Sequence, residues 1–219
     1  MPVTVLAIAD QVSANLYEHF RPEQWAGVDL ILSCGDLPPD YLGFLCSSLD
    51  VPVLYVRGNH DGDYEASRYD GCVNVHARIV QCKGLRIAGF EGSHLYNHGP
   101  YQYSERAMSA LVRRLRIKSM WAGRPDIVLT HAPPAGCHDG KDQCHRGFAA
   151  FNTAMRVWQP QFFVHGHTHA YEGWNRDTQI GATTVINAYP HYLFKVEARV
   201  TAEQTEAGLQ REPGLPGYK

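Results

Sequence analysis

The sequence predicts an α/β fold, in which strands and helices alternate along one domain. Three observations lead to this prediction: short apolar runs recur along the chain, polar turns separate them, and stretches with helical periodicity lie between them. A chain of 219 residues is long enough for one domain with a large core and short for a further module. We therefore expect a single domain over residues 1–200.

The predicted strands begin with VTVLAIA near the N-terminus, a run of β-branched and aliphatic residues with the length of a typical strand. Similar runs follow at intervals, and a turn at Pro190 joins the last two. Together the predicted strands cover residues 3–9, 30–34, 51–56, 85–90, 126–130, 161–166, 183–189 and 192–200.

Helical patterns lie between these runs, at residues 13–20, 40–49, 104–118 and 148–158. The third helix has Ser104 as its N-cap and turns Met108, Leu111 and Leu115 towards the core. Its opposite face is typical of a solvated helix surface and carries Arg113, Arg114, Arg116 and Lys118. The apolar periodicity ends after Val200, so we expect residues 201–219 to form a C-terminal tail.

Composition and charge exclude several classes of protein. Apolar residues make up 44% and charged residues 19%, as in soluble globular domains, and the net charge of −2 argues against binding to duplex nucleic acid or anionic lipid. The N-terminus lacks the basic and apolar segments of a signal peptide or membrane anchor, so we expect a cytoplasmic protein. The six cysteines form no CxxC pair, which favours reduced thiols.

Side chains that can bind metals follow several of the predicted strands. The carboxyl ends of strands are where ligand sites form in α/β sheets, because the loops there converge on one edge. The segment FFVHGHTH, for example, is an apolar run that ends in closely spaced histidines, and buried imidazoles need hydrogen-bond partners or a metal. The residues at these strand ends are Asp10, Asp36, Asn59, His60, His131, His167 and His169.

Glycines make this pattern more specific, because Gly35, Gly58 and Gly166 each precede a candidate ligand. A residue without Cβ lets the chain turn sharply out of a strand and direct the next side chain to a shared centre. The ligand set combines carboxylate, imidazole and amide oxygen. That mixture favours Mn²⁺, Fe²⁺ or Zn²⁺ over Ca²⁺, which prefers oxygen ligands alone.

The motifs GD, GNHD, a single histidine and GHxH occur here in the order of the calcineurin-like metallophosphoesterases, which the chain resembles over roughly residues 3–190. The resemblance implies a two-sheet β-sandwich flanked by helices, a four-layer α-β-β-α arrangement of the metallo-dependent phosphatase fold. It also implies two divalent metal ions at one end of the sheets and hydrolysis of phosphate esters.

By this resemblance, Asp36 bridges the two ions, and Asn59, His131 and His167 complete one site. Asp10 and His169 serve the other. A hydroxide that bridges the ions is then the nucleophile, His60 is the general acid for the leaving group, and Asp61 orients the His60 ring. The family pattern gives His165 no metal ion, so we expect its imidazole either to pack in the core or to contact the metal ligands.

One position departs from the family pattern, which places a histidine two residues after the first aspartate. Here the stretch reads ADQVS, so Val12 stands in that place and cannot bind a metal. Three alternatives stay open: water completes the site, Gln11 or His19 replaces the histidine, or the ion at this site is weakly bound.

Two polar loops, at residues 91–105 and 132–148, are expected to face the substrate, because loops at the mouth of a site carry specificity. The candidates for substrate contact are His94, His145 and Arg146. Arginine is included because its guanidinium group can donate two parallel hydrogen bonds to phosphate oxygens. The tyrosines of the first loop either stack on a base or pack on the loop itself; they are Tyr96, Tyr101 and Tyr103.

These inferences favour a phosphodiesterase that acts on a small or nucleotide-like substrate, since His60 can protonate a poor leaving group. A phosphomonoesterase or a nucleotide pyrophosphatase is the alternative within the same class. A different class is a degenerate family member that binds a metal or a phosphorylated ligand without catalysis. We expect a monomer or homodimer with no membrane partner.

Overall fold

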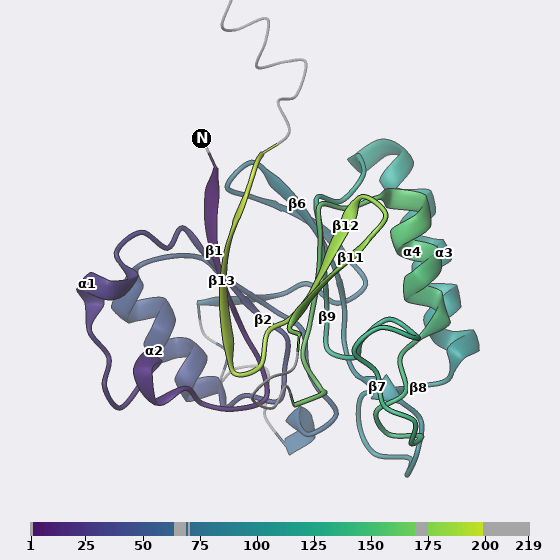
Figure 1. Ribbon diagram of the computed structural model, residues 1–219, viewed down its shortest axis with the longest axis horizontal. Helices are drawn as coiled ribbons and strands as arrows, with labels where there is room; N and C mark the ends of the chain where they lie inside the picture. Colours follow the sequence, from purple (N-terminus) through teal and green to yellow (C-terminus); the bar gives the residue numbers. More distant parts are fainter. Residues whose placement is uncertain (1, 64–68, 70, 170–174, 199–219) are drawn as a thin grey trace, which may run out of the picture.

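The computed structural model describes residues 2–63, 69, 71–169 and 175–198 and consists of two packed β-sheets with helices on both outer faces (Figure 1). Helices α1 (Pro22–Trp25) and α2 (Pro39–Leu49) cover the first sheet. Helices α3 (Glu105–Ala122) and α4 (Ala149–Trp158) cover the second. This four-layer arrangement confirms the fold class predicted from the sequence.

The first sheet has the strand order β13-β1-β2-β3-β4, and all neighbours are parallel except β13 and β1. Its last strand in the sequence, β13, returns to pair with β1 at the edge, so the two ends of the domain lie side by side. The strands are β1 (Val3–Ile8), β2 (Leu30–Ser33), β3 (Val53–Tyr55), β4 (Cys72–Asn74) and β13 (His191–Val196).

The second sheet has the order β11-β12-β10-β9-β6-β5, in which the four central strands are parallel. Its strands are β5 (Ile79–Cys82), β6 (Leu85–Phe90), β9 (Ile127–Thr130), β10 (Phe162–His165), β11 (Asp177–Ile180) and β12 (Thr183–Asn187). A small parallel pair, β7 (Ser93–His94) and β8 (Gln102–Tyr103), lies beyond the end of β6.

The core is built in layers because the strands are buried on both faces. In β1, Val5 and Ala7 face the second sheet, whereas Leu6 and Ile8 pack towards α2. On the other side of the molecule, Trp158 and aromatic residues of α4 fill the space between the second sheet and its helices. Central strands buried on both faces explain why their sequences read as continuous apolar runs.

The first predicted helix is wrong in extent. Only Ala14–Leu16 form a short 3₁₀ turn, and α1 begins separately at Pro22. Pro22 has no N–H and disfavours helical backbone at the residue before it. Arg21 is therefore extended, and a new helix begins at Pro22. The structure also contains short strands that the sequence did not predict: β4, β5, β7, β8 and β11.

The structure also bears on expectations about the cap of α3, the cysteines, membrane spans and the tail. Ser104 caps α3 by accepting a hydrogen bond from the Ala107 N–H, at 3.2 Å, and the basic residues of this helix are exposed. All six cysteines are free thiols. None of the helices in the described part of the chain is both long and apolar enough to cross a membrane. The expected tail at 201–219 lies outside the described residues.

Helix α4 depends on a carboxylate from another helix. Its N-cap residue, Phe148, offers no capping side chain, and the first N–H groups instead donate to Glu105 at the start of α3. Ala149 N lies 3.1 Å from Glu105 Oε2, and Ala150 N lies 2.8 Å from Oε1. Glu105 therefore ties the two helices together and supplies the negative charge favoured at a helix N-terminus.

We expect Glu105→Ala to lower the free energy of unfolding by about 1–2 kcal/mol, the usual cost of removing a helix cap. Urea unfolding of both proteins measures this difference. Glu18→Ala, which removes an exposed carboxylate outside this contact, serves as the control and should change stability much less. Equal stability of Glu105→Ala and the wild type would contradict the capping role.

Candidate metal centre

Three of the predicted ligands leave their strands in an unusual backbone conformation. Asp10, Asp36 and His167 have φ values of 62°, 56° and 68°, in the left-handed region that non-glycine residues seldom adopt. They follow β1, β2 and β10 respectively, at the carboxyl ends of parallel strands. Strained backbone of this kind is concentrated at functional sites, where the surrounding structure holds it in place.

The glycines beside the ligands provide space rather than flexibility alone. A Cβ on Gly58 would overlap the Asp36 carboxylate, and one on Gly166 would lie 2.6 Å from Asp10 Oδ2. The carboxylates can approach the neighbouring loop only because these positions carry no side chain. At Gly58 and Gly166 the need for glycine is therefore steric, whereas the left-handed backbone that glycine favours occurs at Gly35, with φ of 95°.

Asp61 holds two of the ligand loops together. Its Oδ2 accepts hydrogen bonds from the backbone N–H groups of Asp36, at 2.9 Å, and Gly58, at 2.8 Å. In turn, Asp36 Oδ1 accepts the N–H of His60 at 2.8 Å. Among the described residues, Asp61 bonds to backbone groups and not to the His60 ring, so its expected role in orienting that ring stays a prediction.

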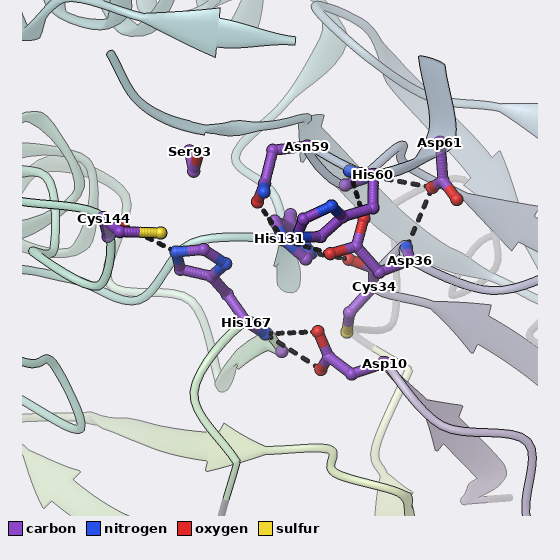
Figure 2. A network of polar contacts seen from close by, with 12 residues as sticks. Asp10, Cys34, Asp36, Asn59, His60, Asp61, Ser93, His131, Cys144 and His167 are labelled. Atoms are coloured by element: carbon purple, nitrogen blue, oxygen red, sulfur yellow. Dashed lines mark hydrogen bonds and ion pairs between the residues drawn. The ribbon is translucent and has the colours of Figure 1, made fainter. Parts of the chain in front are cut away.

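The imidazole of His131 is fully buried and faces two oxygen acceptors (Figure 2). Its Nδ1 donates to the carbonyl of Cys34 at 2.8 Å, which leaves Nε2 with a lone pair in the neutral ring. That Nε2 lies 3.0 Å from Asn59 Oδ1 and 3.3 Å from Asp36 Oδ2. Three lone pairs therefore converge, and only a cation or a proton on Nε2 can compensate them.

His167 completes this convergence. Its Nε2 donates to the carbonyl of Cys144 at 2.7 Å, so the lone pair of the neutral ring is on Nδ1. Ligand atoms of Asp36, His131 and His167 all lie within 4.8 Å of one another. With the oxygen of Asn59, these side chains form a mixed oxygen and nitrogen set that fits a divalent transition metal.

Without an ion, burial and the neighbouring charges shift the pKa values of the groups in this centre. Burial lowers the pKa of His131, but the Asp36 carboxylate outweighs it and raises the pKa to about 9. Burial raises the pKa of Asp36, but the charge of His131 and its hydrogen bonds lower it to about 2. Burial lowers the pKa of His167 to about 3, which keeps that ring neutral and able to bind a metal.

Asp10 presents a second unsatisfied acceptor. Among the described residues, its carboxylate has one hydrogen-bond donor, the N–H of His167, which both oxygens share at 3.0 and 2.9 Å. Burial raises the pKa of Asp10 to about 7, with the charge of His131 acting in the opposite direction. A carboxylate with so few partners fits a site for a cation.

The remaining members of the second predicted site lie apart from the first group. In the described part of the chain, Asp10 and His169 do not join the close cluster of Asp36, His131 and His167. His169 is exposed and stacks on Tyr189, with ring centroids 4.5 Å apart. The metal-binding roles of Asp10 and His169 therefore stay predictions.

His60 lies beside this centre, next to Asp36 and Asn59 (Figure 2). It lines a hollow together with Tyr96 and Pro100. The Tyr96 hydroxyl accepts a hydrogen bond from Asn59 Nδ2 at 3.2 Å, so this tyrosine contacts a predicted ligand directly. The sequence placed Tyr96 only in a substrate-facing loop; its contact with Asn59 follows from the tertiary structure.

The other two tyrosines of this loop are bound within the protein. The hydroxyl of Tyr101 contacts Arg57, and that of Tyr103 donates to the buried Glu91 at 2.6 Å. Tyr101 and Tyr103 therefore pack within the protein and do not stack on a base of the substrate. Tyr96 alone of the three faces the candidate metal centre in the described residues.

The three predicted substrate contacts are divided between two hollows. His94 stacks on Phe148, with centroids 3.9 Å apart, and shares its hollow with Arg146. His145 lines another hollow together with His169, and its ring centroid lies 5.2 Å from that of His167. Of the three, His145 is therefore the one next to a candidate ligand; substrate binding by all three stays a prediction.

His165 is buried and bonds to residues outside the ligand group. Its Nδ1 donates to the Gly166 carbonyl at 2.9 Å, and its Nε2 accepts from His138 at 3.0 Å. His138 Nε2 in turn accepts from the Thr178 hydroxyl at 2.9 Å. This chain of hydrogen bonds attaches the loop that carries His138 to strands β10 and β11.

Comparison with known proteins gives the family. A family model described as calcineurin-like phosphoesterase matches residues 10–171, which include all the predicted ligands. The chain therefore belongs to the calcineurin-like phosphoesterase family, in agreement with the order of its motifs. A search of curated proteins found no match to this sequence.

Solved structures share this fold at low sequence identity. One is 15% identical with a TM-score of 0.58, and the match covers 89% of this chain and 98% of the other. A hypothetical protein from Thermus thermophilus is 15% identical over 84% of this chain and 75% of its own, with a TM-score of 0.51. GAP50, the anchor in the inner membrane complex of Plasmodium, is 14% identical over 85% and 71%, with a TM-score of 0.49.

The raised pKa of His131 predicts how the metal-free protein responds to pH. A histidine whose pKa rises from about 6.5 to about 9 on folding stabilises the fold below pH 6.5, and this contribution is lost as the pH rises towards 9. In EDTA, we expect the free energy of unfolding to fall by roughly 1–2 kcal/mol between pH 6.5 and 8.5. Urea unfolding at both pH values measures it.

A matched variant and an ion provide the controls for this measurement. Asp36→Asn removes the carboxylate that raises the pKa of His131, so its stability should depend less on pH in this range. In saturating Zn²⁺, the free energy of unfolding should instead rise with pH over this range, because the ion competes with the proton for Nε2 of His131. A metal-free wild type with equal stability at both pH values would contradict the ion pair.

Asp36→Asn should also disturb metal binding more than a change at any single histidine. Asp36 is predicted to contact both ions, and an amide cannot offset their charge. We expect metal content to fall by more than in His169→Ala, as measured by elemental analysis after dialysis against Mn²⁺. Full metal content and full activity in Asp36→Asn would remove it from the ligand set.

Proposed function

We propose that this protein is a metal-dependent hydrolase of phosphate esters that prefers diesters with a small or nucleotide-like group. The observation that carries the proposal is the convergence of acceptor atoms from Asp36, Asn59, His131 and His167. Membership of the calcineurin-like phosphoesterase family supports the same reaction class.

These four residues would hold one divalent ion, and Asp10, Asp36 and His169 would hold a second. When bound, such ions polarise phosphoryl oxygens and lower the pKa of water towards neutrality. The oxygen and nitrogen ligand set favours Mn²⁺, Fe²⁺ or Zn²⁺. The chain contributes a neutral imidazole for this purpose at His167, since burial lowers the pKa of this residue to about 3.

His60 would supply the proton that the leaving oxygen needs. Its backbone N–H is anchored on Asp36 Oδ1, while the residue itself is exposed in the hollow beside the ligands. An imidazole at that position is placed to act as a general acid, a role that matters for a basic alkoxide and little for a weakly basic phenolate. This is why we favour diesters over activated monoesters.

The hollow beside His60 would also receive one group of the substrate. Asn59 and Tyr96, which are linked by a hydrogen bond, line it together with Pro100. Tyr96 offers an aromatic face and a hydroxyl in a place where the leaving group of a diester would lie. A nucleoside or another small ring would fit this combination.

A direct test compares metal-free and Mn²⁺-loaded protein on bis-p-nitrophenyl phosphate, p-nitrophenyl phosphate, cyclic nucleotides and a nucleotide pyrophosphate. We expect Mn²⁺-dependent turnover that is faster on diesters. Faster turnover of monoesters would show a phosphomonoesterase, and faster turnover of the pyrophosphate would show a nucleotide pyrophosphatase. Metal binding without turnover of any ester would instead favour a binding module.

His60→Ala should leave metal content intact and slow diester hydrolysis according to the leaving group. General acid catalysis contributes roughly 10²–10⁴-fold when the departing oxygen is basic. We therefore expect a loss of that order for an alkyl diester or a cyclic nucleotide and a much smaller loss for a p-nitrophenyl ester, both measured as kcat.

His98→Ala is the matched control, because His98 is an exposed histidine of the neighbouring loop outside the ligand group. It should retain activity on both substrates. A similar loss on both esters in His60→Ala would remove His60 from the role of general acid.

A further inference from the structure

The second ion would lack a ligand because Val12 stands where the family has histidine, and the structure weakens one of the proposed replacements. The Val12 side chain packs against the apolar cluster on the α2 side of the first sheet. The Oε1 atom of Gln11 accepts a hydrogen bond from the hydroxyl of Tyr189, which engages the side chain elsewhere. The candidates that remain for this ion are His19, water and a ligand from another segment.

His145 has the chemistry of a metal ligand. Its Nδ1 donates to both oxygens of Asp142, at 2.9 and 3.0 Å, and its backbone N–H donates to Oδ1 at 3.0 Å. This fixes the proton on Nδ1 and leaves Nε2 with a lone pair that has no hydrogen-bond partner among the described residues. A carboxylate behind the imidazole is the usual support of a metal-binding histidine, since it orients the ring and makes it more basic.

The position of His145 also matches the second site. It lines one hollow with Thr168 and His169, and its ring centroid is 5.2 Å from that of His167. His145 thus lines the same hollow as His169, the remaining histidine that the family pattern assigns to this ion.

The loop that carries His145 is attached to the first metal site. The carbonyl of Cys144, the preceding residue, accepts the Nε2–H of His167 at 2.7 Å (Figure 2). That hydrogen bond sets the tautomer of His167 and holds residues 142–145 beside the ligands. The side chain of His145 is 46% exposed, so its ring can turn towards an ion without disturbing the core.

We propose that Nε2 of His145, supported by Asp142, replaces the missing histidine at position 12 and binds the second ion together with His169. This inference rests on the proposed function for the existence of two ions. It assigns a metal-binding role to a residue whose sequence position suggested contact with phosphate. It also makes the loop at 132–148 part of the metal centre rather than a specificity loop alone.

The test is isothermal titration of metal-free protein with Mn²⁺ alone, with elemental analysis of the loaded protein. We expect two ions in the wild type. His145→Ala should keep the tighter ion and bind the other at least about 10-fold more weakly, and Asp142→Asn should weaken the same ion by about 10–100-fold. His98→Ala is the matched control, and His19→Ala and Gln11→Ala test the alternatives; all three should leave both affinities unchanged.

Co²⁺ provides a second measurement that does not depend on activity. The visible absorption of bound Co²⁺ depends on its ligands, so the spectrum of the second equivalent should change in His145→Ala and remain wild-type in His98→Ala. Circular dichroism of each variant verifies that the loop substitution leaves the fold intact. Because these measurements follow the ions directly, they separate this inference from the question of which ester is cleaved.

Three results would overturn the inference. They are unchanged affinities for both ions in His145→Ala, loss of the second ion in His19→Ala or Gln11→Ala instead, and a single ion in the wild type. Unchanged ion binding with slower ester hydrolysis in His145→Ala would assign the residue to the substrate. Two bound ions, of which the weaker depends on His145, in a protein that cleaves no phosphate ester would support the inference and contradict the proposed function.

Discussion

The buried imidazole of His131 faces two oxygens, and this contact is the constraint on which the rest of the site depends. Its Nδ1 donates a hydrogen bond to the Cys34 carbonyl, so in the neutral ring Nε2 is an acceptor. This atom faces the oxygens of Asp36 and Asn59, which are acceptors too. Because His131 is buried, such a cluster is unfavourable unless a positive charge joins it. Either a proton, at the raised pKa of about 9, or a metal ion satisfies it. The same geometry thus explains both the response to pH of the metal-free protein and its capacity to bind a metal.

The loops around His131 are built to keep these acceptors close. The left-handed backbone of Asp36 and His167 brings their side chains into one cluster with His131, and Asp61 holds two of the loops together by accepting hydrogen bonds from their backbone N–H groups. Both sheets contribute: Asp10 and Asp36 follow strands of the first, and His131 and His167 follow strands of the second. Packing of the two sheets is therefore what assembles the centre, and stability and metal binding are coupled.

Much of the fold could be predicted, because the central strands are buried on both faces and their apolar runs are unmistakable. The short strands β4, β5 and β11 could not, since they lie towards the sheet edges, where half-exposed side chains give no continuous apolar run. The expected helix at 13–20 did not form for a different reason: Pro22 limits its length, and Leu16 is its only buried apolar residue, so it has no apolar face to bury. Local patterns are thus reliable where burial is complete and weak where it is partial.

The family, the order of the candidate ligands and the departure at Val12 could be read from the sequence, because they depend only on residue type and position along the chain. Which acceptors converge, which ring nitrogen of His131 and of His167 donates, and that Tyr96 contacts Asn59 became evident from the folded chain alone. The tertiary structure also placed Asp142 behind His145, in a hollow shared with His169. The physical reason is that hydrogen-bond partners and distances join residues far apart in the chain. The packing of the two sheets sets those distances, and no spacing in the sequence records them.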